Sequence, residues 1–356
     1  MKSTGIIIEY NPFHNGHLHH LNETKKMFKD NVIIAVMSGN FTQRGDVSII
    51  NKWDKTKLAL NFGVDIVVEL PFHYATQSAD FFSKGALEIL NELKVENIVF
   101  GSESGDINLL YKYASKLIND NPILINNESY PSNILKSINI EKPNDILGIT
   151  YIKEIIRNKY NIKAYTIKRN TNYHSKDLKE CSATSIREAL KTNKKINEYI
   201  PYKFKYENLK FIEDYYSLLK YKILCTDDLS IYNGVDEGLE NRIKKVIIKS
   251  NSLDELINNI KSKRYTYSRI KRMLLHILIS FTKTDNEKYK NINYIRILGY
   301  SNKGIKYLNK IKRDLNLPLI TNFNKYKDLL YLEYKTSSIY DINNINFEFN
   351  MPIKKD

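Results

Sequence analysis

Two histidines near the start of the chain, His14 and His17, have the residue type and spacing that suit phosphate chemistry. They follow a short apolar run at 6–8 and the dipeptide Asn11–Pro12, which is typical of a turn. If a helix begins near Asn15, both imidazoles point toward whatever lies above its N-terminus. The free N–H groups there suit phosphate, and imidazole N–H donors would stabilise negative charge that phosphate oxygens gain in a transition state.

A second candidate phosphate site lies at the predicted start of a later helix, in the segment SATSIR at 182–187. Ser182, Thr184 and Ser185 place hydroxyl groups beside free N–H groups, and Arg187 adds positive charge in the first turn. This segment would face a pyrophosphate from the side opposite the histidines. The alternative is a plain capping box, which uses the same residue types.

Four other candidate residues follow predicted strands, where open parallel sheets bind their ligands. Gly101 follows the fourth strand and would let an adenine or ribose approach, unless it only forms a turn. Arg169 and Asn170 follow the fifth strand and are candidates for the nucleotide edge or for RNA. Arg44 lies in the polar loop after the second strand and is a candidate substrate contact.

The elements that must position these residues alternate between strands and helices in the first half of the chain. Short apolar runs predict strands at 6–8, 32–37, 65–71, 96–101 and 163–168, and helical spacing predicts helices at 16–30, 51–62, 78–93, 107–118 and 145–158. This pattern predicts an α/β fold with a Rossmann-like parallel sheet over residues 1–195. A mainly helical second domain is expected over 196–356, in which 294–298 and 319–321 either pair as strands or are buried segments.

Composition indicates a protein that meets an anionic partner. The chain has 356 residues and a formal net charge of +15, which favours nucleic acid, an anionic membrane surface or a polyphosphate. Its two cysteines, Cys181 and Cys225, form no metal or disulfide pattern. Because the sequence shows neither a signal peptide nor a transmembrane stretch, we expect a cytoplasmic protein without a membrane partner.

The segment 261–272 is the strongest candidate for RNA contact. Six of its residues are basic, none is acidic, and two are tyrosines. Lys and Arg can neutralise phosphates, and tyrosine can stack on unpaired bases. With Arg44, the predicted RNA-binding residues are Lys263, Arg264, Tyr265, Arg269, Lys271 and Arg272. The alternative is a solvated helix face.

Several motifs in this order resemble those of the tRNA(Met) cytidine acetate ligases, which belong to the nucleotidylyltransferase superfamily with its HxGH turn. They are GIIIEYNPFHNGH at 5–17, MSGNFTQRG at 37–45, VELP at 68–71, FGSE at 100–103, PNDILG at 143–148, SATSIR at 182–187, KRYT at 263–266 and IRILGYSNKG at 295–304. The resemblance covers most of the chain, and the N-terminal motifs are the more specific ones.

The resemblance implies an ATP-dependent ligase. Such an enzyme forms acetyl-adenylate and pyrophosphate from acetate and ATP, then transfers the acetyl group to N4 of the wobble cytidine, position 34, of elongator tRNA(Met). The product is N4-acetylcytidine. We expect Mg²⁺ to be held mainly by the ATP phosphates rather than by a protein metal site. No stable protein partner is implied.

The resemblance also implies site residues. His14, His17 and Arg187 match the residues that hold the phosphates, and these three are the predicted catalytic residues. The predicted ATP site comprises Ile7, Ile8, Glu9, Tyr10, Asn11, Pro12, Phe13, His14, Asn15, Gly16, His17, Leu18, His19, His20, Gly101, Asn144, Arg169 and Asn170, with Ser182, Thr184 and Ser185 of the second phosphate segment.

Two other functions stay open from the sequence. One is another nucleotidylyltransferase, such as a cofactor-forming enzyme or the acetate-activating ligase of a lyase system, which would not need a basic helical domain. The other is a non-catalytic RNA-binding protein on the same fold. The presence of His14, His17 and Arg187 argues against the second alternative.

Overall fold

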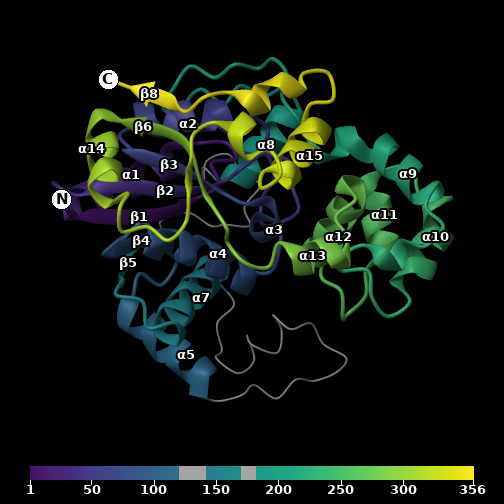
Figure 1. The fold of residues 1–356 in the computed structure, drawn as a ribbon. Helices are drawn as coiled ribbons and strands as arrows, with labels where there is room; N and C mark the ends of the chain where they lie inside the picture. Colours follow the sequence, from purple (N-terminus) through teal and green to yellow (C-terminus); the bar gives the residue numbers. More distant parts are fainter. Residues whose placement is uncertain (120–141, 170–181) are drawn as a thin grey trace.

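A sheet of eight strands forms the centre of the protein, whose computed structural model describes residues 1–119, 142–169 and 182–356. The strand order is β5-β4-β1-β2-β3-β6-β7, and β8 also pairs with β6. Strands β5, β4, β1, β2 and β3 run parallel to their neighbours. The predicted α/β fold with a Rossmann-like parallel sheet is therefore confirmed (Figure 1).

The elements of the first part of the chain alternate as predicted. They are β1 (Ser3–Ile8), α1 (Asn15–Met27), β2 (Val32–Ser38), α2 (Lys52–Asn61), β3 (Ile66–Leu70), α3 (Phe72–Ala75), α4 (Ala79–Glu92), β4 (Asn97–Ser102), α5 (Ile107–Asn119), α7 (Pro143–Arg157), β5 (Lys163–Lys168) and α8 (Ala183–Lys191).

Helices cover both faces of the sheet because its central strands are apolar on both sides. In β2, Val32, Ile34 and Val36 pack in one core with α4, α5, α7 and α14. The alternate residues of the same strand, Ile33 and Ala35 among them, pack in a second core with α1 and α2. Successive strand residues point to opposite faces, so a continuous apolar run fills two cores at once.

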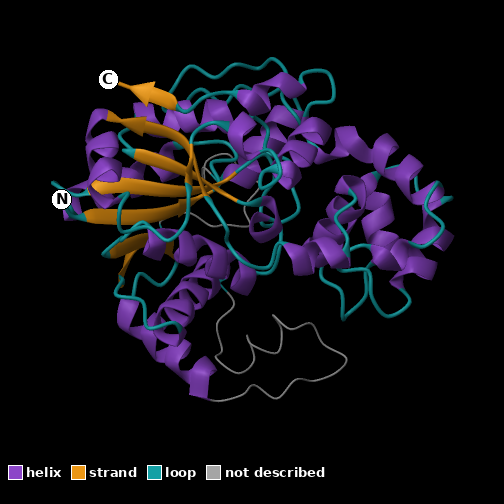
Figure 2. Cartoon of the chain, in the orientation of Figure 1, coloured by secondary structure: helices purple, strands orange, loops and turns teal. Residues whose placement is uncertain are grey.

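A helical body, defined here as residues 212–288, follows the first part of the chain. It contains η2 (Ile212–Tyr215), α9 (Tyr216–Leu224), η3 (Leu229–Ile231), α10 (Leu239–Ile247), α11 (Leu253–Ile260), α12 (Tyr267–Ile279) and α13 (Lys283–Lys288). Its own core includes Ile243, Leu256 and Leu274. Figure 2 shows α9 to α12 as a lobe of helices to one side of the strands.

The last part of the chain returns to the sheet, which the mainly helical description of 196–356 did not include. It contains β6 (Ile295–Ser301), α14 (Asn302–Ile311), β7 (Leu319–Ile320), η4 (Phe323–Tyr326), α15 (Tyr331–Tyr340), η5 (Ile345–Phe349) and β8 (Ile353–Lys355). Strand β6 pairs antiparallel with β3, and β7 and β8 pair with β6. Of the two alternatives for 294–298 and 319–321, strand pairing is the correct one. A division at residue 195 stays a prediction, but the sheet does not end there.

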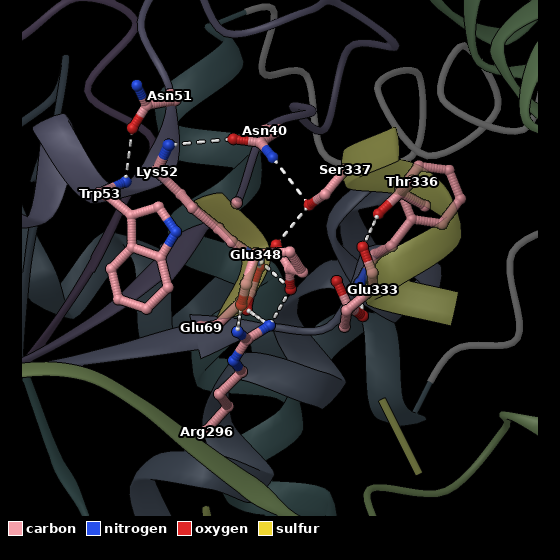
Figure 3. A network of polar contacts seen from close by, with 12 residues as sticks. Asn40, Asn51, Lys52, Trp53, Glu69, Arg296, Glu333, Thr336, Ser337 and Glu348 are labelled. Atoms are coloured by element: carbon pink, nitrogen blue, oxygen red, sulfur yellow. Dashed lines mark hydrogen bonds and ion pairs between the residues drawn. The ribbon is translucent and has the colours of Figure 1, made fainter. Parts of the chain in front are cut away.

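A buried ionic network fastens this returning segment to the sheet (Figure 3). Lys52 Nζ lies 2.7 Å from Glu69 Oε1 and 2.9 Å from a Glu348 carboxylate oxygen. Arg296 Nη1 lies 3.2 Å from Glu69 Oε2 and also pairs with Glu348. All four side chains are at most 3% exposed. Two cations and two carboxylates thus neutralise one another, which explains how a charged residue sits in the apolar strand β6.

Candidate nucleotide site

The opening turn places His14 and His17 side by side at the N-terminus of α1. His14 caps the helix, and its Nδ1 accepts a hydrogen bond from the Gly16 N–H at 3.0 Å. The His14 backbone N–H donates in return to His17 Nδ1 at 3.3 Å. The two ring centroids are 3.8 Å apart. The backbone reaches this position through Tyr10, whose φ of 48° is in the left-handed region.

Both imidazoles are neutral near pH 7. Burial lowers the pKa of His14 to about 3, with further lowering by Arg169 and Arg187. Burial, followed by the neighbouring His14 and Arg169, holds the pKa of His17 well below its usual range. Because Nδ1 of each ring accepts a hydrogen bond, the proton of each neutral ring is on Nε2. The neutral rings thus bring two imidazole N–H groups to the start of α1, and their role as donors to phosphate stays a prediction.

A cavity of about 500 Å³, called the nucleotide cavity here, lies above this turn. The predicted residues that line it are Ile7, Ile8, Glu9, Tyr10, Asn11, His14, Asn15, Gly16, His17, His19, His20, Gly101, Asn144, Arg169, Ser182, Thr184 and Arg187. Segments separated by more than 170 residues are thus brought together at the carboxyl ends of the strands.

Four predicted residues do not line the nucleotide cavity: Pro12, Phe13, Leu18 and Ser185. Phe13 is fully buried and packs against Phe62. Ser185 forms a capping box with Ser182, in which each side chain bonds the other's backbone N–H. For Ser185 the plain capping alternative describes the structure. Asn170 lies outside the described residues.

Three buried polar atoms near the cavity have no hydrogen-bond partner among the described residues. They are Tyr10 Oη, His20 Nε2 and Arg169 Nε. Buried polar atoms are normally paired, so unpaired ones need an explanation. All three residues line the nucleotide cavity, so unpaired polar atoms are concentrated around this site.

Arg187 and Gly101 have additional local roles. Arg187 Nη1 donates to the Asn11 carbonyl at 2.8 Å, which links α8 to the opening turn. A Cβ on Gly101 would lie 3.1 Å from Cγ of Arg169. The glycine therefore makes room for the Arg169 side chain, whereas the sequence suggested room for a base or ribose.

Sequence reasoning missed several lining residues. The large apolar ones are Phe82, Phe100, Ile146, Leu147, Tyr151 and Ile167. They lie inside predicted helices and strands, where an apolar residue is normally assigned to the core. Asp46 was also missed, although it lies in the loop that contains Arg44. Its carboxylate is 2.8 Å from Lys271 Nζ and 3.8 Å from Arg187 Nη2.

A buried lysine, Lys55, holds the loops around the cavity together. Its Nζ donates to the carbonyls of Glu9, Ser38 and Gly39 at 3.0, 2.8 and 2.6 Å, and to Ser48 Oγ at 2.8 Å. Burial lowers the pKa of Lys55 to about 7. Burial also raises the pKa of the Glu9 carboxyl, which accepts from the Gln43 N–H at 2.7 Å. Lys55 thus fixes where β1 and β2 end.

Comparison with known proteins gives the same assignment along the whole chain. A family model described as HIGH Nucleotidyl Transferase matches residues 1–352. The tRNA(Met) cytidine acetate ligase of Geobacillus sp. (strain WCH70) is 40% identical over 374 residues, covering 95% of this chain and 93% of that protein. The enzyme of the same name from Bacillus subtilis (strain 168) is 38% identical, covering 96% and 92%.

This chain belongs to the HIGH nucleotidyl transferase family. Within it, the chain groups with the tRNA(Met) cytidine acetate ligases, so the resemblance seen in the motifs is confirmed. Two crystal structures of Thermotoga maritima TmcAL cover 99% of both chains at 30% identity. The apo form superposes with a TM-score of 0.89, and the form bound with alpha-thio ATP with 0.88.

In this nucleotidyl transferase, the predicted RNA-binding residues do not form one surface. Arg44 lines the nucleotide cavity. Lys263 and Arg264 are exposed before the start of α12, and Arg264 pairs with Glu237. Tyr265 is only 7% exposed, and its hydroxyl donates to Glu237 at 2.6 Å. The ring of Tyr265 is therefore not available to stack on a base in this structure.

Of the other basic residues of this segment, Lys271 and Arg272 face the α/β part of the protein, whereas Arg269 packs on Tyr265. The Arg269 guanidinium lies 4.6 Å from the Tyr265 ring centroid. Lys271 is paired with Asp46. Burial, then Arg269 and Arg44, lowers the pKa of Arg272 to about 10, and its Nη1 donates to the Gln43 carbonyl at 3.4 Å. Helix α12 thus connects the helical body to the rim of the nucleotide cavity.

The described residues include no group of three or more His, Cys, Asp or Glu that could hold a metal ion. The two carboxylates that line the nucleotide cavity are already engaged. Glu9 accepts from the Gln43 N–H, and Asp46 is paired with Lys271. In the same part of the chain, none of the helices has the length and apolar character needed to cross a membrane.

Proposed function

We propose that this protein activates acetate with ATP and transfers the acetyl group to N4 of the wobble cytidine of elongator tRNA(Met). One observation carries the proposal: a chain similar from end to end to tRNA(Met) cytidine acetate ligases retains two neutral histidines facing a cavity with unpaired polar atoms. Neutral N–H donors and arginines suit a polyphosphate whose negative charge shifts during reaction.

The first step needs no protein nucleophile. An acetate oxygen attacks the α-phosphorus of ATP, the bond to the β-phosphate oxygen breaks, and pyrophosphate leaves. His14, His17 and Arg187 would hold the phosphates on the leaving side. Positioning and charge stabilisation supply the catalysis, because the carboxylate itself is the nucleophile.

Mg²⁺ would accompany ATP on its phosphates. The donor set of the described residues does not fit a metal held by the protein, because Glu9 and Asp46 are engaged and no ligand cluster is present. Bound to the phosphates, the ion would neutralise part of their negative charge.

The second step requires the mixed anhydride to meet a cytosine amine. The N4 nitrogen forms a bond to the acetyl carbon, AMP leaves, and the nitrogen loses a proton. The anticodon base must leave its stack to reach the cavity. The helical body, which lies next to the cavity rim and contains the basic segment 261–272, is the part of the protein that we assign to tRNA binding.

The deciding assay uses purified protein, ATP, labelled acetate and unmodified elongator tRNA(Met). N4-acetylcytidine at the wobble position is expected, with none in a transcript that carries uridine there. Acetate-dependent exchange of pyrophosphate into ATP is expected without tRNA. Exchange that depends on a mononucleotide instead would favour a cofactor-forming enzyme. RNA binding without any exchange would favour a non-catalytic RNA-binding protein.

A further inference from the structure

A second cavity, of about 290 Å³, adjoins the nucleotide cavity at the junction with the helical body. Arg44, Asp46, Thr184 and Arg187 line both cavities and form their common wall. A group bound in the second cavity would therefore lie next to the phosphates or the activated acetyl group. The second cavity is smaller than its neighbour and suits a single planar ring rather than a whole nucleotide.

The second cavity has aromatic walls and a charged lining in which acidic and basic side chains alternate. Tyr267, in the first turn of α12, and Phe211 contribute rings. Asp254 accepts a hydrogen bond from the Tyr267 hydroxyl at 2.5 Å, which fixes the ring of Tyr267. Unstacked bases bind on aromatic side chains held in this way. The rings of the second cavity therefore offer a stacking surface that Tyr265 does not.

Glu213 has one carboxylate oxygen without a donor, on a side chain that is 38% exposed. Its Oε1 is 2.8 Å from Lys191 Nζ, but its Oε2 is buried and has no hydrogen-bond partner among the described residues. An exocyclic amine would supply the missing N–H. A uracil presents a carbonyl oxygen at that ring position. Its partial negative charge would face the negative carboxylate, and no hydrogen bond would form.

We infer that the second cavity receives the cytosine to be acetylated, with Tyr267 stacking on the ring and Glu213 accepting from its amine. The inference rests on the proposed function. It names the part of the site that selects the acceptor base, at the junction that joins the ATP-binding part to the helical body. Glu213 and Tyr267 act on recognition of the base rather than on adenylate formation.

The first test compares Tyr267→Ala with Tyr267→Phe. Acetyl transfer to tRNA(Met) by Tyr267→Ala should fall at least about tenfold, since stacking is worth about 1–3 kcal/mol per base. Tyr267→Phe keeps the ring and should retain most transfer. Acetate-dependent pyrophosphate exchange should be unchanged in both. Tyr221→Ala, which removes a 68% exposed tyrosine from α9, is the matched control for folding and expression.

The second test uses Glu213→Gln. The amide can donate to a uracil carbonyl, so a tRNA(Met) transcript with uridine at the wobble position should become a stronger competitive inhibitor of transfer than it is for the wild type. Unchanged inhibition would overturn the role of Glu213. Unchanged transfer by Tyr267→Ala, or equal loss of transfer and exchange, would overturn the role of the cavity. A wild-type enzyme that exchanges pyrophosphate but acetylates no tRNA would overturn the proposed function itself.

Discussion

The nucleotide cavity and the ionic network are both polar regions buried in the same sheet, and they handle polarity in opposite ways. In the network, Lys52, Glu69, Arg296 and Glu348 each pair with an opposite charge. In the cavity, the histidines are neutral, and polar atoms such as Arg169 Nε have no partner among the described residues.

The difference distinguishes polar groups that stabilise the fold from polar groups that bind a ligand. A buried charge that is fully paired adds little net stability but is costly to break. A buried polar atom that is left unpaired costs free energy in the empty protein, and a ligand can recover that cost. The network should therefore govern unfolding, whereas the cavity should govern ligand affinity and rate.

The largest expected effect is on stability, from Arg296→Met. The substitution leaves two buried carboxylates opposite Lys52 alone, and breaking such a network costs roughly 3–5 kcal/mol. Urea unfolding would measure the loss. Arg313→Met, at an exposed position, is the matched control and should be nearly neutral. Equal unfolding free energies for the two variants would show that the network is not structural.

The next effect is on catalysis, from His17→Ala. Loss of one donor to the developing phosphate charge should lower acetate-dependent pyrophosphate exchange about 10²–10³-fold. Binding of tRNA should be largely retained, as measured by filter binding. His17→Gln keeps an N–H donor at a similar reach and should recover part of the rate. If His17→Ala removed exchange and tRNA binding equally in a folded protein, the assigned division of labour would be wrong.

Acid should destabilise the protein through its buried histidines. Burial lowers the pKa of His14 and His73 to about 3 and of His20 and His276 to about 4, while an unfolded chain takes up these protons near pH 6.5. This stability is present above pH 6.5 and is lost as pH falls, at about 1.4 kcal/mol per pH unit for each histidine.

Buried carboxyls act in the opposite direction, because burial raises the pKa of Glu9, Glu88 and Glu333. Burial raises the pKa of Glu333 to about 8. The stability that this carboxyl contributes therefore increases as pH falls from 8 toward 4.5, and it offsets the stability lost through about one histidine. The free energy of unfolding should still decrease between pH 6.5 and 5.5. His276→Phe should make that decrease less steep by the contribution of one histidine, about 1.4 kcal/mol per pH unit. Stability that does not change over this range would mean that the buried rings accept protons.

The smallest expected effect on stability comes from Arg264→Ala. Arg264 and Glu237 are 48% and 44% exposed, and such surface pairs are worth less than about 1 kcal/mol. If Arg264 contacts a tRNA phosphate, the slope of log K for tRNA binding against log salt concentration should become shallower by about one in this variant. Lys290→Ala removes a comparable exposed pair with Glu287 and should leave tRNA binding unchanged.

Much of the site could be predicted because it is built from local patterns. The strand, the turn and the helix around His14 are adjacent in sequence, and apolar runs identify the other strands. The return of β6 could not be predicted in the same way. Its pairing with β3 joins residues more than 220 positions apart, and Arg296 interrupts its apolar pattern.

The surroundings of individual side chains could not be predicted from local patterns. Lys52 and Lys55 lie in a predicted helix, where lysine is normally solvated, yet both are fully buried and bonded to oxygen atoms. Tyr265 was predicted to be an exposed stacking surface but is covered by its neighbours. Lys52 bonds Glu69, Lys55 bonds Ser38 and Tyr265 bonds Glu237, and no local pattern indicates these contacts.

The ionic network also has a consequence for how the chain is made. Lys52 and Glu69 leave the ribosome on the order of tens of seconds before Arg296 and Glu348, at synthesis rates of about 5–20 residues per second. During that interval the growing polypeptide carries β3 without its neighbour β6, and an unpaired strand edge can capture other chains. Residues 295–356 therefore cover an otherwise unpaired strand edge as well as completing the sheet.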